Sequence, residues 1–168
     1  MRENSIEPRV GQRLCTRGFT LPELVIVMIL AGLMAAYAMP KFESAMSLRN
    51  DAWRDQVQAA MRYAQKTAVS HRRLVCAGVA GSVVNLTIAT VRGSTTCNGN
   101  LAGPDGVSQF GSSGASDVAT TVSPAGTIYF QPDGRVTSDA AGVTTSTRTF
   151  TFTGAPSLVL YGETGYAQ

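Results

Sequence analysis

The chain of 168 residues has very few of the residues on which enzyme active sites depend. It contains one histidine, His71, and three cysteines, with no cysteine or histidine pair at the spacing of metal ligands. It also lacks a glycine-rich motif that would cradle a phosphate. His71 lies in a basic stretch near the end of an expected helix, where a cation interacts favourably with the helix dipole. We therefore expect no enzyme activity, no cofactor and no metal site.

Charged residues are also scarce, at 15% of the chain, and they are unevenly distributed. The net charge is +3, and the first 18 residues contribute about two of these charges through four arginines against two glutamates. The small remainder does not indicate a nucleic-acid-binding protein. Six basic residues could still form a phosphate-binding strip on a helix: Arg49, Arg54, Arg62, Lys66, Arg72 and Arg73. Asp51 and Asp55 lie among them, so a solvated helix face explains the charges as well, and DNA is a disfavoured partner.

One long apolar run interrupts this otherwise ordinary composition. Between Phe19 and Met39 the only charged residue is Glu23. A helix of this stretch is about 31 Å long, which matches the hydrocarbon thickness of a bilayer. Arginines are concentrated before the run, and the residues after it mix both signs of charge. The positive-inside rule therefore places the N-terminus in the cytoplasm and the bulk of the chain outside the membrane.

Two simpler interpretations of the apolar run are a conventional secretory signal and a membrane anchor that is never processed. The run closes with Ala36, Tyr37 and Ala38, which form an acceptable small-x-small cleavage site. Neither interpretation explains Glu23, because a carboxylate inside an apolar span costs roughly 2.5 kcal/mol or more and usually has a functional partner. Cleavage after Ala38 would also discard the segment that anchors the chain.

The residues around the start of the run resemble the class III signal of type IV pilins and pseudopilins. The resemblance rests on the sequence from Gly18 to Leu24, GFTLPEL, on the basic leader before it and on the apolar helix that follows as far as Pro40. It implies that a prepilin peptidase cuts after Gly18 and that the new amine of Phe19 is methylated. It also implies that Glu23 pairs with the amine of a neighbouring subunit during fibre assembly, and that Pro40 kinks the helix.

The helical pattern continues beyond Pro40. Apolar residues such as Trp53, Val57, Ala60 and Ala64 recur at spacings of three, four or seven, with charged residues mainly between them. We therefore predict one long helix, apolar throughout its first half and amphipathic in its second. The expected division is a leader at 1–18, a transmembrane and assembly helix at 19–40, an amphipathic half-helix at 41–73 and a β-rich extracytoplasmic domain at 74–168.

After Arg73 the composition shifts to Val, Thr, Gly and Ser, and the periodicity becomes that of strands. We expect hairpins around Gly81 and around Pro132-Asp133-Gly134, two further strands near the C-terminus, and a long surface loop between Gly93 and Gly126 with room for one short strand. Such strands need an apolar partner surface, which the second half-helix provides. The predicted fold class is α+β: a long N-terminal helix against a small, mainly antiparallel sheet.

The three cysteines divide by position. Cys15 lies in the leader, whereas Cys76 and Cys97 lie in the presumed folded part. A pair in an exported protein is a disulfide candidate and would stabilise the fold by roughly 3 kcal/mol. The alternative is two unpaired thiols, one of them buried.

The β-rich part more faintly resembles the GspH/FimT branch of minor pilins and pseudopilins. That resemblance rests on Tyr129-Phe130-Gln131-Pro132-Asp133-Gly134 and on a terminal apolar strand followed by Gly162-Glu163-Thr164-Gly165. Members of this branch typically end with a glycine and a basic residue, and some bind DNA with that tail. Here Tyr166 follows Gly165, which disfavours DNA uptake.

These resemblances together imply a non-enzymatic minor pilin or pseudopilin that helps to initiate or cap a type IV pilus or a type II secretion pseudopilus. The alternative is a fibre-borne subunit for adhesion or DNA capture. The implied partners are the prepilin peptidase, other subunits and the bacterial inner membrane, which the chain would cross once with its C-terminal domain in the periplasm. An MSHA-type pilus fits the same residues, and the sequence does not choose among these machines.

Overall fold

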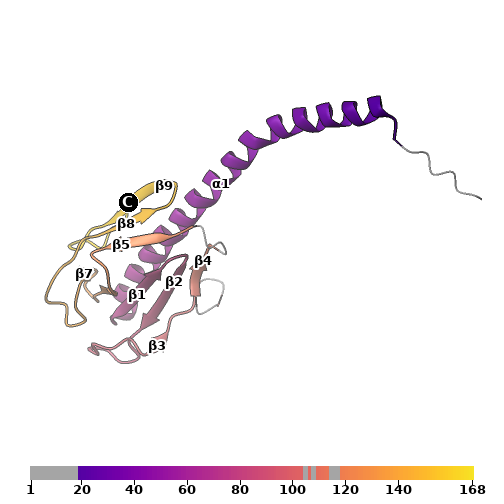
Figure 1. Cartoon of the computed structure of the whole chain (residues 1–168). Coiled ribbons are helices and arrows are strands. Elements are labelled where there is room, and N and C mark those ends of the chain that lie inside the picture. Colours follow the sequence, from indigo (N-terminus) through magenta and orange to yellow (C-terminus); the bar gives the residue numbers. More distant parts are fainter. Residues whose placement is uncertain (1–18, 104–105, 107–108, 114–117) are drawn as a thin grey trace, which may run out of the picture. The chain divides into compact units, whose positions relative to one another are not determined.

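A computed structural model describes residues 19–103, 106, 109–113 and 118–168, with the side chains of 39–47 and 109 outside the description. The described chain has one helix, α1 (Leu21–His71), and nine strands (Figure 1). The chain divides into two compact units, Met1–Lys41 and Phe42–Gln168. The predicted leader, including Cys15 and Gly18, lies outside the described residues.

Helix α1 runs for 51 residues, so the prediction of one long helix is confirmed. Glu23 lies in its first turn, where an acidic group interacts favourably with the helix dipole. The helix ends in a Schellman arrangement, because Arg72 adopts a left-handed conformation with φ of 51°. The N–H groups of Arg72 and Arg73 donate to the carbonyl oxygens of Val69 and Ala68, which would otherwise lack partners.

The strands form two antiparallel sheets. The larger has the order β3-β2-β1-β6-β7, with β4 also pairing with β2, and the smaller has the order β5-β8-β9. The larger sheet contains β1 (Val75–Ala80), β2 (Val83–Ile88), β3 (Gly99–Asn100), β4 (Gln109–Ser112), β6 (Ile128–Phe130) and β7 (Val136–Thr137). The smaller contains β5 (Thr120–Ser123), β8 (Arg148–Phe152) and β9 (Ala155–Leu160). The α+β class is therefore confirmed.

The segment between Gly93 and Gly126 differs from the prediction. Its described residues carry three short strands, β3, β4 and β5, instead of a loop with room for one. Each is stabilised by pairing with a longer strand far from it in sequence, β3 and β4 with β2, and β5 with β8. The last strand also begins at Ala155 instead of Leu158, because two residues, Thr153 and a left-handed Gly154, complete the turn from β8.

The second half of α1 supplies the apolar stripe on which both sheets pack. Its buried residues are Trp53, Val57, Ala60, Met61, Ala64 and Ala68, all in one core cluster with residues of the two sheets. Trp53 is 1% exposed, and its indole N–H donates a 2.7 Å hydrogen bond to the hydroxyl of Thr120 at the start of β5. The buried indole nitrogen of Trp53 therefore has a hydrogen-bond partner although it lies on an apolar stripe.

Candidate assembly site

The first part of α1 is the candidate assembly segment. The window Leu21–Ala38 has a mean hydropathy of 2.0, is long enough to cross a membrane, and has none of its residues buried within the described chain. Phe19, just before the helix, is 74% exposed, and Glu23 is exposed as well. Pro40 lies within α1. An apolar surface of this length, with none of its residues buried among those that the structure describes, is suited to lipid or to the helices of other proteins.

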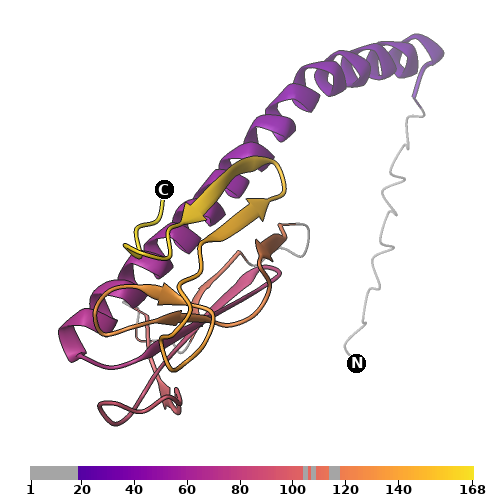
Figure 2. The ribbon, with the colours of Figure 1, turned by 90° about the vertical axis from the view of Figure 1, so that its left-hand side faces the viewer.

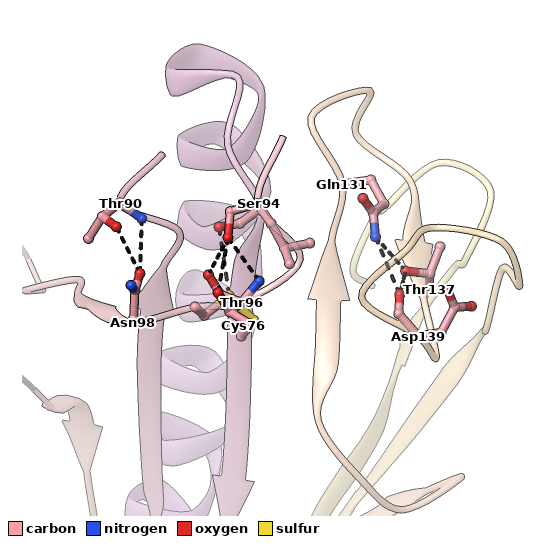
Figure 3. The surroundings of a disulfide bond; sticks show 10 residues. Cys76, Thr90, Ser94, Thr96, Asn98, Gln131, Thr137 and Asp139 are labelled. Carbon is pink, nitrogen blue, oxygen red and sulfur yellow. Dashed lines mark hydrogen bonds between the residues drawn. A yellow bond between two sulfur atoms is a disulfide. The ribbon is translucent and has the colours of Figure 1, made fainter. Parts of the chain in front are cut away.

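The two cysteines of the folded part belong to the second compact unit, Phe42–Gln168. Cys76 on β1 and Cys97 just before β3 form a disulfide with a Cα–Cα distance of 6.1 Å (Figure 3). It ties the segment after β2 to β1, alongside a 2.8 Å hydrogen bond from Ala89 N–H to the carbonyl of Leu74. Side-chain bonds within that segment, from Thr90 to Asn98 and between Ser94 and Thr96, hold its shape.

Two sequence stretches behind the fainter family resemblance meet at one residue of α1. Gln65 donates from Nε2 to the carbonyl oxygens of Gly134 at 3.2 Å and Thr164 at 2.5 Å. Gly165 lies against the same carbonyl of Gly134, with no room for a Cβ, and both glycines have positive φ. Figure 2 shows the C-terminal segment running beside the helix. The two stretches therefore have a structural role in holding the C-terminus on α1.

Residues one and two turns earlier on α1 hold the same C-terminal segment. Gln58 and Arg62 donate to the carbonyl of Ala167 at 3.0 and 3.2 Å, and the guanidinium of Arg62 lies 5.7 Å from the ring centre of Tyr166. Arg62, one of the six basic residues considered for phosphate binding, is therefore partly engaged within the fold. Arg54 is engaged too, with the carbonyl of Pro156 and with Asp55.

Arg148 on β8 is 2% exposed, and it is the one buried basic residue among the side chains that the structure describes. Its guanidinium donates to the carbonyl oxygens of Pro124, Ala125 and Thr127, just before β6. Burial lowers the pKa of Arg148 from its ordinary value. Because its partners are main-chain carbonyls, its role is to fasten the segment between the two sheets.

Two aspartates organise turns near the C-terminal half. Burial acts to raise the pKa of Asp133, but the backbone N–H and guanidinium of Arg135 hold that pKa below its ordinary value. The N–H groups of Val143 and Thr144 donate to the carboxylate of Asp139 at 3.0 and 2.8 Å and lower its pKa. Both contacts are explained by turn formation.

Among the described residues, no three His, Cys, Asp or Glu side chains gather as a metal site would require.

The sequence predicted roles for Phe19, Glu23, Pro40, Cys76 and Cys97, but it did not reveal the role of Gln65 or Arg148. Gln65 was hidden because its partners are 69 and 99 residues away. The only sign of this role in the sequence is the pair of glycines, Gly134 and Gly165, which lie in the two short stretches that carry the fainter family resemblance. The structure brings Cys76 and Cys97 together, whereas Phe19 and Glu23 lie on the other compact unit.

Comparisons with known proteins identify relatives of this chain. The family described as type II transport protein GspH matches residues 54–164, about two thirds of the chain, and the prokaryotic N-terminal methylation motif matches residues 13–39. The type IV narrow pilus major component PilA5 of Thermus thermophilus is 36% identical over 110 residues, which are 64% of this chain and 77% of that protein. A crystal structure of the type IV minor pilin FimU of Pseudomonas aeruginosa aligns with a TM-score of 0.48 and 18% identity, over 71% of this chain and 86% of that one. The chain belongs to the type IV pilin and pseudopilin family, in its GspH branch.

Proposed function

We propose that this chain is a prepilin that is cut after Gly18, methylated on Phe19 and built into a type IV pilus or type II secretion pseudopilus. The observation that carries the proposal is the exposed apolar window Leu21–Ala38, which lies within the match to the N-terminal methylation motif at residues 13–39. Before assembly, this window holds the chain in the inner membrane, with the N-terminus in the cytoplasm and the β-rich unit in the periplasm. In the fibre, the same apolar surface packs against other subunits.

Glu23 has a defined part in this proposal. Its carboxylate lies within the apolar window, where an unpaired charge is costly. Cleavage creates a free amine on Phe19, four positions earlier in the chain. Pairing of Glu23 with the Phe19 amine of a neighbouring subunit neutralises both charges and sets how far one subunit is displaced from the next.

The experiment that tests processing is the intact mass and N-terminal sequence of the protein from its native membrane. A methylated Phe19 as the first residue is the expected result. A first residue at Met39 would indicate a secreted domain, and an uncut Met1 would indicate a simple anchor; either would end the proposal. Replacement of Gly18 by a bulky residue should leave the leader attached, while the same variant still enters the membrane.

The narrower proposal is that the subunit acts at the start or tip of the fibre. The match to the GspH family over residues 54–164 supports it. The similarity to a protein named as a major pilus component favours the second candidate, a subunit repeated along the fibre. Quantitative mass spectrometry of purified fibres separates them, because a tip or initiating subunit is present in a few copies per fibre and a repeated one in proportion to fibre length.

A further inference from the structure

Arg72 has an unusual backbone conformation for a residue with a long side chain. Among the residues that the structure describes, it is the one residue other than glycine with a positive φ, at 51°. It follows the last residue of α1, a position where glycine is favoured because a Cβ makes the left-handed conformation costly. Its side chain is exposed and gains no burial in return. Strained conformations cluster at functional sites, so the strain at Arg72 indicates a role for the arginine side chain itself.

Three unpaired guanidinium groups occur at this end of α1. Arg72 is followed by the half-buried Arg73, and the exposed Arg92 lies in the segment between β2 and β3. Within the part of the chain that the structure describes, none of these three guanidinium groups has a hydrogen-bond or ion-pair partner. By contrast, the guanidinium groups of Arg62 and Arg148 bond to carbonyl oxygens of the fold. The three unpaired groups are therefore available to a group from another molecule.

The disulfide between Cys76 and Cys97 holds Arg92 close to the end of α1. The segment that contains Arg92 begins at Ala89, whose N–H donates to the carbonyl of Leu74, three residues after α1 ends. The segment ends at Cys97, which is bonded to β1 (Figure 3). Ala89 and Arg92 are three residues apart, a distance of at most about 11 Å along the chain. One extended ligand can therefore contact all three guanidinium groups.

The segment after β2 also presents hydroxyl and amide groups beside these arginines. Thr95, Thr96 and Asn98 are exposed. Bonds from Thr90 to Asn98 and between Ser94 and Thr96 hold the segment in shape, so a ligand meets a preformed surface. Hydroxyl and amide groups form hydrogen bonds with the hydroxyl groups of sugars, and guanidinium groups bind carboxylates with two parallel bonds.

These features match nucleic acid poorly. The stretches 71–74 and 89–100 contain no aromatic residue on which a base would stack. Three guanidinium groups also neutralise few phosphates, whereas proteins that bind duplex DNA tightly contact about six to ten. A polymer whose units carry both carboxylates and hydroxyl groups fits the site better.

We propose that Arg72, Arg73 and Arg92 form a binding site for an acidic polysaccharide. Its carboxylates lie on the three guanidinium groups, and its hydroxyl groups contact the segment after β2. The site is at the end of the half-helix 42–71, about 44 Å from the residue at which the chain enters the second compact unit. The inference goes beyond the proposed function, because it adds a ligand at residues outside the assembly segment.

The full chain in a neutral detergent provides the test, with polygalacturonate as the carboxylate-bearing polysaccharide and dextran as the neutral one. Biolayer interferometry should show binding to polygalacturonate that weakens as the salt concentration rises, and no binding to dextran. Arg73→Gln and Arg92→Gln should each weaken the binding several-fold. Lys66→Gln is the matched control, since it removes the same charge from an exposed position of α1, and it should bind as the wild type does.

Arg72→Gly separates ligand binding from fold stability. Glycine relieves the strained backbone, so the midpoint of thermal unfolding should rise by about 2 °C. The affinity for polygalacturonate should nevertheless fall several-fold. Arg72→Lys keeps the charge but not the planar fork, and it should retain part of the affinity. A residue that served only to end the helix would leave the affinity unchanged when replaced by glycine.

Four results would overturn the inference: equal binding of dextran, no binding of polygalacturonate, unchanged affinity in both Arg72→Gly and Arg92→Gln, or tighter binding of duplex DNA than of polygalacturonate at equal charge concentration. The proposed function is tested separately at Phe19. A cut and methylated Phe19 without polysaccharide binding contradicts the inference alone. An uncut leader on a chain that binds polygalacturonate contradicts the proposed function alone.

Discussion

The carbonyl oxygen of Gly134 lies against Gly165 at the point where a side chain on Gly165 would begin. Both residues bend with positive φ, and Gln65 donates to Gly134 and to Thr164 beside Gly165. The C-terminal segment, the β6–β7 turn and α1 therefore meet at one point without space for a methyl group.

Replacing Gly165 with alanine should destabilise the fold by about 2 kcal/mol or more, because the new Cβ collides with the Gly134 carbonyl and the backbone is strained. Thermal unfolding of the full chain in detergent measures this. Gly93→Ala is the matched control, since Gly93 also has positive φ but open space around it, and should cost about 1 kcal/mol. Equal losses in the two variants would contradict the close contact.

Replacing Cys97 with serine should lower the free energy of unfolding by about 3 kcal/mol. The disulfide to Cys76 restricts the conformations of the unfolded chain, and without it the unfolded chain gains conformational entropy. Denaturant unfolding with and without a reducing agent provides the measurement. The reductant should destabilise the wild-type chain and leave Cys97→Ser unchanged. A processed wild-type chain that shows two free thiols before reduction would rule the bond out.

The stabilising contribution of Asp139 should decrease at acidic pH. Its carboxylate accepts two backbone N–H bonds, so its folded pKa lies below the ordinary value of 3.8. Its contribution is complete above that value and disappears as the pH falls through the lower folded pKa. Asp139→Asn should therefore flatten the stability profile below about pH 4 relative to the wild type. Unfolding midpoints between pH 2 and pH 7 test this, and parallel profiles would refute it.

Changing Glu23 to alanine should leave membrane insertion intact, because the substitution makes the apolar window more apolar. Incorporation into fibres should fall sharply, because in the proposed pairing the amine of the neighbouring subunit loses its partner. Membrane fractionation and immunoblotting of sheared fibres measure the two effects separately. Glu23→Asp retains the charge and should keep more incorporation than alanine. Normal incorporation of the alanine variant would argue against charge pairing.

Much of the fold was predictable because α1 carries a regular signal. Trp53, Val57, Ala60 and Ala64 repeat with the helical period, and all four are buried on the face that contacts the sheets. The helix end near His71 was also apparent from the change in composition that follows it. Local periodicity is enough for such features because each turn of the helix repeats the same contact.

The strands β3 to β5 were not predictable in the same way. They lie in a stretch rich in Gly, Ser, Thr, Asn and Asp, and β3 has only two residues, so no alternating apolar pattern marks them. Their stability comes from partners elsewhere, as in the pairing of Thr120 with Phe152. The division of the strands into two sheets has the same origin, since long-range pairing is not encoded in neighbouring residues.

The sequence also indicated the candidate assembly segment more readily than the contacts that hold the C-terminal segment. Glu23 stands out as a charge in an apolar run, whereas the role of Gln65 depends on carbonyl oxygens of residues 69 and 99 positions away. A glutamine on an amphipathic helix carries no signal by itself.

Trp53 is the single tryptophan of the chain, and it is buried where α1 meets β5 with its indole bonded to Thr120. Its fluorescence is therefore an internal probe of whether the sheets stay docked on the helix. The emission should remain blue-shifted while the subunit leaves the lipid and joins a filament if the β-rich unit travels as a rigid body. A red shift during that transfer would mean that the helix and the smaller sheet separate along the way.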